Sequence, residues 1–103
     1  MTFKLIIALV NDDCSEVVQK AARKAGATGS TIINNARGEG SEPHKTFFGL
    51  NLTGQCDVML FLVEAGCADA VLEAINKAAG FDETRGAGMA FQVDVEKVVG
   101  EKI

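Results

Sequence analysis

The chain has 103 residues, of which 48% are hydrophobic and 23% charged, with a formal net charge of −4. This length fits a single domain over residues 1–103, and the balance of apolar and charged residues is that of a globular protein. The acidic charge argues against a nucleic-acid binder, which needs a basic face to neutralise phosphates. No apolar run reaches the roughly 20 residues of a membrane span, so direct membrane insertion is not expected.

The N-terminus and the cysteines favour a cytoplasmic protein. The apolar stretch over residues 5–10 is too short for a signal peptide, and an acidic pair follows it instead of a cleavage site. The single histidine, His44, has no clustered partner, so neither a metal site nor a histidine base is expected. No CxxC spacing occurs, which favours reduced thiols over disulfides or zinc. The cysteines are Cys14, Cys56 and Cys67.

The first half of the chain predicts strand, helix and strand. Residues 3–10 are apolar apart from Lys4, which indicates a strand buried on both faces. A helix is expected next, with Asp13 and Glu16 forming a capping box at its start and Gly26 ending it. The β-branched segment 30–34 predicts a second strand. The apolar stripe of the helix would consist of Val17, Val18, Ala21, Ala22 and Ala25.

The second half begins with an irregular stretch. Residues 38–55 follow no period and contain scattered glycines, so we expect a long flexible loop, and such loops are usually functional. Residues 56–63 predict a buried strand, 65–79 a second helix and 89–95 a last strand, while 96–103 would cross the surface. The side chains of the last strand would alternate, with Phe91, Val93 and Val95 on one face and Gln92 and Asp94 on the other.

This order of elements predicts the α+β ferredoxin-like βαββαβ plait, a four-stranded antiparallel sheet with two helices on one face. In the strands at 3–10 and 56–63 both the odd-numbered and the even-numbered positions are mostly apolar, so the second face of the sheet would be apolar as well. Because a large apolar face does not stay exposed in water, we expect it to be buried by copies of the same chain. The number of copies does not follow from this pattern.

Two glycine pairs mark candidate binding positions. Arg37-Gly38-Glu39-Gly40 follows the second strand, and Arg85-Gly86-Ala87-Gly88-Met89 leads into the last one. Glycines spaced one apart let backbone N–H groups approach an anion closely. Turns also use glycine for purely conformational reasons, so both interpretations stay open at this point.

Several segments, taken in order, resemble the PII signalling family, that is nitrogen regulatory protein P-II and its divergent PII-like members. The segments are residues 26–33, 36–40, 47–49, 86–91 and 95–100. The resemblance implies a homotrimer whose sheets line a central barrel, with adenine nucleotides (AMP, ADP or ATP) bound in clefts between subunits. It also implies a regulatory role in nitrogen or carbon metabolism or in transport, exerted on a transporter, channel or metabolic enzyme through the loop at about 38–55.

The resemblance further assigns the nucleotide site. The residues that it implies are Thr31, Gly38, Glu39 and Gly40 at the base of the loop, Leu62 behind the adenine, Arg85, Gly86, Ala87, Gly88 and Met89 in a phosphate turn, and Lys102 reaching over from a neighbouring subunit. Nitrogen-sensing members carry a lysine where Met89 stands, so a strong contact to the outer phosphates is lost. Arg37 and Arg85 would partly replace it. We therefore do not expect sensing of ATP with magnesium and 2-oxoglutarate.

Two other functions remain as alternatives. The same plait occurs in oligomers of the CutA type and in ligand-binding domains of the ACT type, in which the glycine turns would hold no nucleotide. An acyl-phosphate hydrolase shares the plait but needs an arginine after the first strand, where this chain has Asn11-Asp12-Asp13-Cys14. Cys14 near a helix start is a candidate nucleophile, but the adjacent acids disfavour its thiolate. We expect a regulatory binding protein and not an enzyme.

Overall fold

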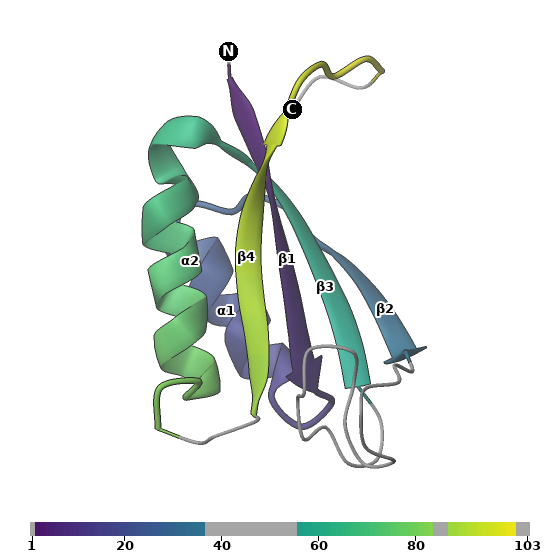
Figure 1. The fold of residues 1–103 in the computed structure, drawn as a ribbon, viewed down its shortest axis with the longest axis vertical. Coiled ribbons are helices and arrows are strands. Elements are labelled where there is room, and N and C mark those ends of the chain that lie inside the picture. Colours follow the sequence, from purple (N-terminus) through teal and green to yellow (C-terminus); the bar gives the residue numbers. More distant parts are fainter. Residues whose placement is uncertain (1, 37–55, 84–86, 101–103) are drawn as a thin grey trace.

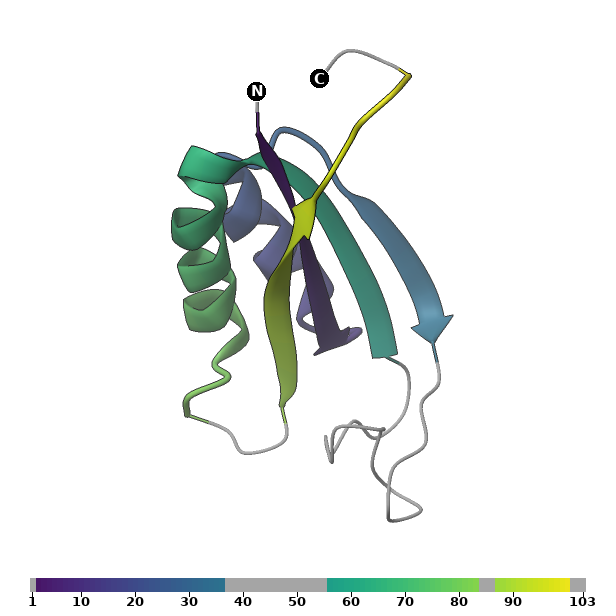
Figure 2. The same cartoon turned by 45° about the horizontal axis from the view of Figure 1, so that its top comes forward.

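The fold is the predicted ferredoxin-like plait. The computed structural model describes residues 2–36, 56–83 and 87–100, so the predicted loop at 38–55 lies outside the described part. The elements are β1 (Phe3–Asn11), α1 (Ser15–Ala25), β2 (Thr31–Ala36), β3 (Cys56–Glu64), α2 (Ala65–Ala79) and β4 (Gly88–Val95). The strands form one antiparallel sheet in the order β2-β3-β1-β4, and both helices cover the same face (Figure 1 and Figure 2).

The start of α1 differs from the predicted capping box. The N-cap residue is Cys14, and no side chain caps the helix. The Cys14 N–H donates to the carbonyl oxygen of Asn11 at 2.9 Å, which closes a turn directly after β1. This turn places the helix start one residue later than the sequence suggested, so Glu16 is not three residues after the cap. The capping box of Asp13 and Glu16 is therefore wrong.

The hydrophobic core lies between the two helices and the face of the sheet that they cover. On that face the alternate residues of the two central strands are at most 3% exposed: Ile6, Ala8, Val10, Met59, Phe61 and Val63. The helices contribute Val18, Ala22, Ala68, Val71 and Ile75. Val17, predicted to share the apolar stripe of α1, is 50% exposed. A helix rotates by about 100° per residue, so burial of Val18 turns its neighbour toward solvent.

The opposite side of the sheet, which we call the helix-free face, is apolar too. The strand register places its side chains in rows across the strands: Ile33, Val58, Leu9 and Met89, then Thr31, Leu60, Ile7 and Phe91, then Leu62, Leu5 and Val93. Ile33 and Val93, on the two edge strands, are 49% and 39% exposed. The prediction that the sheet is apolar on both faces is therefore confirmed.

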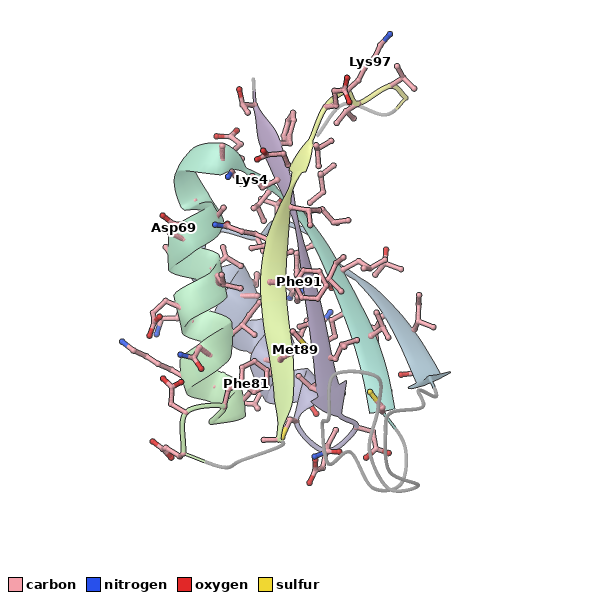
Figure 3. All side chains as sticks on the ribbon, viewed as in Figure 1. Lys4, Asp69, Phe81, Met89, Phe91 and Lys97 are labelled. Atoms are coloured by element: carbon pink, nitrogen blue, oxygen red, sulfur yellow. The ribbon has the colours of Figure 1, made fainter. Side chains whose placement is uncertain are left out.

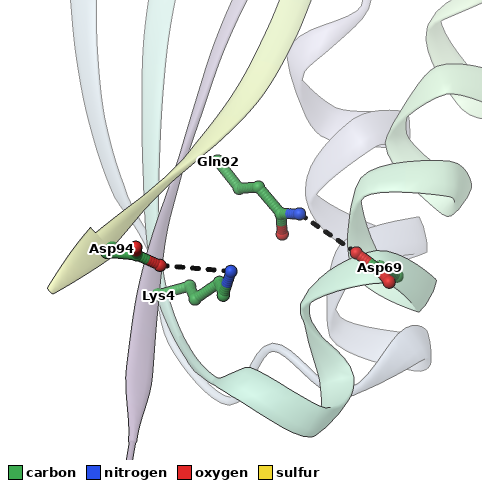
Figure 4. Close-up of polar contacts among 4 residues, drawn as sticks. All are labelled: Lys4, Asp69, Gln92 and Asp94. Atoms are coloured by element: carbon green, nitrogen blue, oxygen red, sulfur yellow. Dashed lines mark hydrogen bonds and ion pairs between the residues drawn. The ribbon is translucent and has the colours of Figure 1, made fainter.

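Polar contacts at the end where β1 begins tie β4 to its neighbours (Figure 4). The Lys4 Nζ lies 3.2 Å from the Asp94 Oδ1, and the Gln92 Nε2 donates to the Asp69 Oδ1 of α2 at 3.0 Å. Because both contacts are open to solvent, each contributes roughly 1 kcal/mol or less to folding. The alternation predicted for β4 is confirmed, since Gln92 and Asp94 share the helix side while Phe91 and Val93 lie on the helix-free face.

Candidate functional site

One end of the sheet gathers the segments that the sequence singled out. We call it the loop end; β1 and β2 finish there, and β3 and β4 begin there (Figure 1). The register shows the same arrangement, because Cys56 pairs with both Ala36 and Asn11, and Val10 pairs with Gly88. The end of β2 and the starts of β3 and β4 therefore lie at the same end of the sheet, with β1 between β3 and β4.

The predicted site residues divide into two sets. Thr31, Leu62, Ala87, Gly88 and Met89 belong to the described part of the chain. The remaining predicted residues lie outside it: Arg37, Gly38, Glu39, Gly40, Arg85, Gly86 and Lys102. Within one chain, Ala87, Gly88 and Met89 lie together at the start of β4, whereas Thr31 and Leu62 lie apart from them on β2 and β3.

Gly88 begins β4 in tight contact with its surroundings. Its φ is +149°, and a Cβ atom built there would overlap the carbonyl oxygen of Leu9 and lie 2.8 Å from the Cε1 of Phe81. Only a residue without a side chain lets β4 start this close to β1. This glycine is therefore required by packing alone, whether or not a ligand binds.

The turn before β4 is held by the last residues of α2. Helix α2 ends at Gly80 in the left-handed conformation, and the N–H groups of Gly80 and Phe81 both donate to the Asn76 carbonyl oxygen, at 3.0 and 3.3 Å. The Asn76 Nδ2 also donates to the Asp82 Oδ2 at 2.9 Å. The Phe81 ring packs against the core beside the start of β4 (Figure 3). Asn76 and Phe81 were not identified from the sequence; the only signal was an aromatic residue directly after a helix-ending glycine.

Met89 lies in a small apolar cluster at the loop end of the helix-free face. Leu9 and Cys56 are 8% and 7% exposed, and Val58 and Met89 pack against them. Burial raises the pKa of the Cys56 thiol, the charge of Asp57 raises it further, and a hydrogen bond with the Val10 backbone lowers it. The thiol is therefore neutral at pH 7, and this part of the site offers hydrophobic contact, not charge.

Thr31 and Leu62 lie away from the loop end. Thr31 begins β2, at the opposite end of the strand from Ala36, so it lies a full strand length from the segment that follows β2, and its place in a nucleotide site stays a prediction. Leu62 pairs with Leu5, four residues along β1 from the partner of Met89. Since β2 and β4 are the two edges of the sheet, Thr31 and Gly88 are separated by three strand spacings across it, about 14 Å, and by three residues along it, about 10 Å in that direction. The two residues therefore do not lie together within one chain.

Strand β2 carries a bulge next to the loop end. Ile33 pairs with Val58 and Ala36 pairs with Cys56, so β2 advances three residues where β3 advances two. One extra residue in an edge strand bends it and changes the direction in which the following chain leaves the sheet. The bulge extends β2 beyond the segment 30–34 that the sequence predicted.

The remaining chemistry gives little support to catalysis by Cys14. Burial raises the pKa of the Cys14 thiol, and the charge and hydrogen bond of Asp13 raise it further, so the thiolate is disfavoured. Within residues 2–36, 56–83 and 87–100, no group of three or more His, Cys, Asp or Glu side chains gathers as metal ligands would. In the same residues, neither helix has the length and apolar character needed to cross a membrane.

Comparison with known proteins identifies the family. None of the curated proteins compared matches the chain. Among solved structures it is similar to CPII, a nitrogen regulatory PII-like protein from Thiomonas intermedia K12 bound to ADP, AMP and bicarbonate, with a TM-score of 0.69 and 21% identity over 100% of this chain and 98% of that one. At this identity the similarity is one of fold. The model of the family described as nitrogen regulatory protein P-II matches residues 3–101. Because this match covers nearly the whole sequence, the chain belongs to the P-II family of regulatory proteins.

Proposed function

We propose that this protein is a cytoplasmic PII-like signal transducer that binds an adenine nucleotide and regulates a target protein through residues 38–55. The nucleotide would bind in clefts between the subunits of a homotrimer, and the protein would have no catalytic activity of its own. The complex of the PII-like structural neighbour with ADP and AMP supports the ligand class. The target would be a transporter or a metabolic enzyme.

The observation that carries this proposal is the convergence of two segments at the loop end. The start of β4 at Gly88 lies at the same end of the sheet as Ala36 and Cys56, which flank the segment 37–55, although β1 and β3 separate it from β2. A phosphate held by backbone N–H groups of residues 85–89 would therefore lie at the end of the sheet where the segment 37–55 begins and ends. Binding energy at the first segment can then shift the conformations available to the second.

The placement of the other residues supports a site shared between chains. Thr31 and Gly88 lie on opposite edges of one sheet and would meet only across a subunit boundary. The apolar helix-free face supplies a surface for such an assembly. In this arrangement Leu62 would pack against the adenine, Arg37 and Arg85 would contribute positive charge, and Lys102 would come from the neighbouring subunit. Gly38, Glu39, Gly40, Gly86, Ala87 and Met89 would complete the cleft.

Calorimetric titration of the purified protein with AMP, ADP, ATP and cyclic AMP tests the proposal, together with sedimentation equilibrium for the oligomeric state. We expect binding near one nucleotide per subunit and the mass of a trimer. Arg85→Glu should weaken binding at least about tenfold, since it replaces a charge-assisted contact by repulsion. Arg23→Glu, an equal change on the exposed side of α1, should leave binding intact. Equal binding by the parent and Arg85→Glu would refute the phosphate turn.

The alternative without a nucleotide site is favoured by one observation. Gly88 is fixed by its contacts with Leu9 and Phe81, so its presence does not require a ligand. A stable trimer that binds none of the four nucleotides would support this alternative, a P-II family plait whose glycine turns hold no nucleotide. Gly88→Asp is unsuitable as a test of the site, because its side chain would displace β4 before it reached a ligand.

A further inference from the structure

We propose that the outer surface of the two helices binds the same surface of a second copy of the protein, related by a two-fold axis parallel to the helices. This surface carries two lines of charged side chains, one on each helix, which we call the helix rows. They are Glu16, Lys20 and Lys24 on α1 and Asp69, Glu73 and Lys77 on α2. The helix-free face lies on the other side of the sheet, so this contact does not compete with the assembly described above.

Both helix rows point away from the core. Residues four apart lie on one side of a helix, and all members of the two rows are exposed. The middle member of each row, Lys20 or Glu73, is two residues from a buried residue in either direction along its helix. Two residues are a rotation of about 200°, so these side chains lie nearly opposite the buried side.

The helix rows lie side by side with opposite charges at each level. Helix α1 starts at the loop end, and α2 starts at the other end, where Gly26 after α1 meets Cys67: a Cβ atom built at Gly26 would lie 3.2 Å from the Cys67 Cβ. Both helices rise about 1.5 Å per residue in opposite directions, so equal steps back from Gly26 and forward from Cys67 stay at one level. The resulting levels are Lys24 with Asp69, Lys20 with Glu73, and Glu16 with Lys77.

Within one chain the two helix rows are not paired with each other. The Lys20 Nζ lies 3.3 Å from the Glu16 Oε1 of its own helix, in an ion pair that is open to solvent. Among the described residues, no ion pair joins α1 to α2. Packed helix axes lie about 8–10 Å apart, and both rows point outward instead of toward one another, so their charges stay available to a partner.

The strip between the helix rows is lined by small apolar side chains. On the far side of α1, the Gln19 Nε2 donates to the Ser30 Oγ at 2.9 Å, and on the far side of α2, the Gln92 Nε2 of β4 donates to the Asp69 Oδ1. The residues on the near sides, which face the space between the helices, are alanines that are exposed or half-buried. They are Ala21 on α1 and Ala70 and Ala74 on α2. Small side chains let the helices of a second copy approach closely.

The charges select one symmetric arrangement and identify the partner as a second copy. A two-fold axis parallel to the helices places α1 of each copy over α2 of the other and keeps the levels, so every positive side chain meets a negative one. A two-fold axis across the helices would place Lys20 over Lys20 and Glu73 over Glu73. Such a contact uses the same surface on both partners, and because exposed ion pairs contribute little each, it is weak and sensitive to salt.

Sedimentation velocity of the full-length protein, from about 10 to about 500 µM and in about 20 or 500 mM NaCl, tests the association. In low salt we expect the mass to rise with concentration above that of the unit assembled through the helix-free face. At high salt the association should be at least about threefold weaker, because screening removes the attraction. A mass that stays constant over this range in low salt would overturn the inference. No nucleotide is present, so either result leaves the proposed function untouched.

A charge swap tests the surface itself. Lys20→Glu and Glu73→Lys each place like charges together twice in the symmetric contact, so each variant should self-associate at least about tenfold more weakly than the parent. A mixture of the two variants restores opposite charges at both places and should associate like the parent. Interferometry with one variant immobilised and the other in solution measures this, and each variant against itself reports exchange of subunits.

The matched controls are Lys97→Glu and Glu96→Lys, which make the same changes in net charge at exposed positions after β4. They should associate like the parent, and circular dichroism should show all variants folded. Single variants that associate as strongly as the parent, or a mixture that associates no better than its components, would overturn the inference.

Discussion

The two faces of the sheet are built from similar residues but are used differently. On β3, Met59 and Phe61 point toward the helices and are at most 1% exposed, whereas Leu60 and Leu62 point to the helix-free face and stay partly exposed. The side chains on the face covered by the helices are buried within the chain, so this face determines the fold of the monomer. The second gains its burial only from other molecules, so it is available for assembly.

The largest expected effect comes from the helix-covered face. Phe61→Ala should lower the free energy of unfolding by about 3–5 kcal/mol, because it leaves a cavity among fully buried neighbours. Leu60→Ala, one position away on the other face, should cost clearly less in the isolated chain. Urea unfolding at a fixed, low protein concentration measures both. Equal losses would remove the distinction between the two faces.

Gly88→Ala should have the next largest effect on stability. Its Cβ would overlap the Leu9 carbonyl oxygen, and the φ of +149° is unfavourable for any residue with a side chain. We expect a loss of roughly 2–4 kcal/mol in thermal or urea unfolding. Gly29→Ala is the matched control, since a Cβ there would meet no atom within 4 Å. If both variants unfold like the parent, the start of β4 does not need its glycine for packing.

Leu60→Lys should separate assembly from folding. Leu60 lies in the middle of the helix-free face, between Thr31 and Ile7 in one row. A charge there would have to be desolvated in any interface, so the trimer should dissociate at least about tenfold more readily while the circular dichroism of the monomer is retained. Val17→Lys, on an exposed position of α1, serves as the control. Sedimentation equilibrium that shows the parent mass for Leu60→Lys would place the assembly surface elsewhere.

The smallest expected effect concerns two thiols, that of Cys14 beside the main core and that of Cys56 on the helix-free face. Burial raises the pKa values of Cys14 and Cys56 above 9.0, so the folded protein holds these protons more tightly than the unfolded chain. Their contribution to stability is therefore complete below pH 9 and is lost as pH rises through the raised pKa values. At pH 8 we expect iodoacetamide to alkylate both thiols more slowly in the native protein than in urea, as followed by mass spectrometry. Equal rates would contradict the shifts.

The order of the elements could be predicted because it depends on local pattern. Apolar runs, helical periodicity and the stop signals Gly26 and Gly80 are all contiguous in the sequence. The errors arose where hydrogen bonding decided the outcome, in a local turn at Asn11 and Cys14 and in the pairing of two strands at β2. The turn closed by Asn11 and Cys14 shifted the start of α1, and pairing of β2 with β3 lengthened that strand through a bulge. Neither pairing nor register can be read from one strand alone.

The candidate site was predictable only in part for the same reason. Glycine pairs are visible in the sequence, but Gly88 is required by its packing on Phe81, which precedes it closely, and on Leu9 of β1, which is distant along the chain. The distance of Thr31 from the segment after β2 depends on where that strand begins and ends, which is decided by its pairing with β3. The role of Asn76 depends on the geometry of a helix end that appears only once α2 has formed.

The packing of Gly88 also bears on how this family would diverge. A descendant that lost its ligand would still keep this glycine, because any replacement collides with the Leu9 carbonyl oxygen and impairs folding. Selection for folding alone would thus preserve Gly88, although this glycine looks like part of a ligand-binding glycine pair. The neighbouring positions Ala87 and Met89 carry no such constraint from the backbone. Their drift, and not the persistence of Gly88, would record whether a lineage still senses its effector.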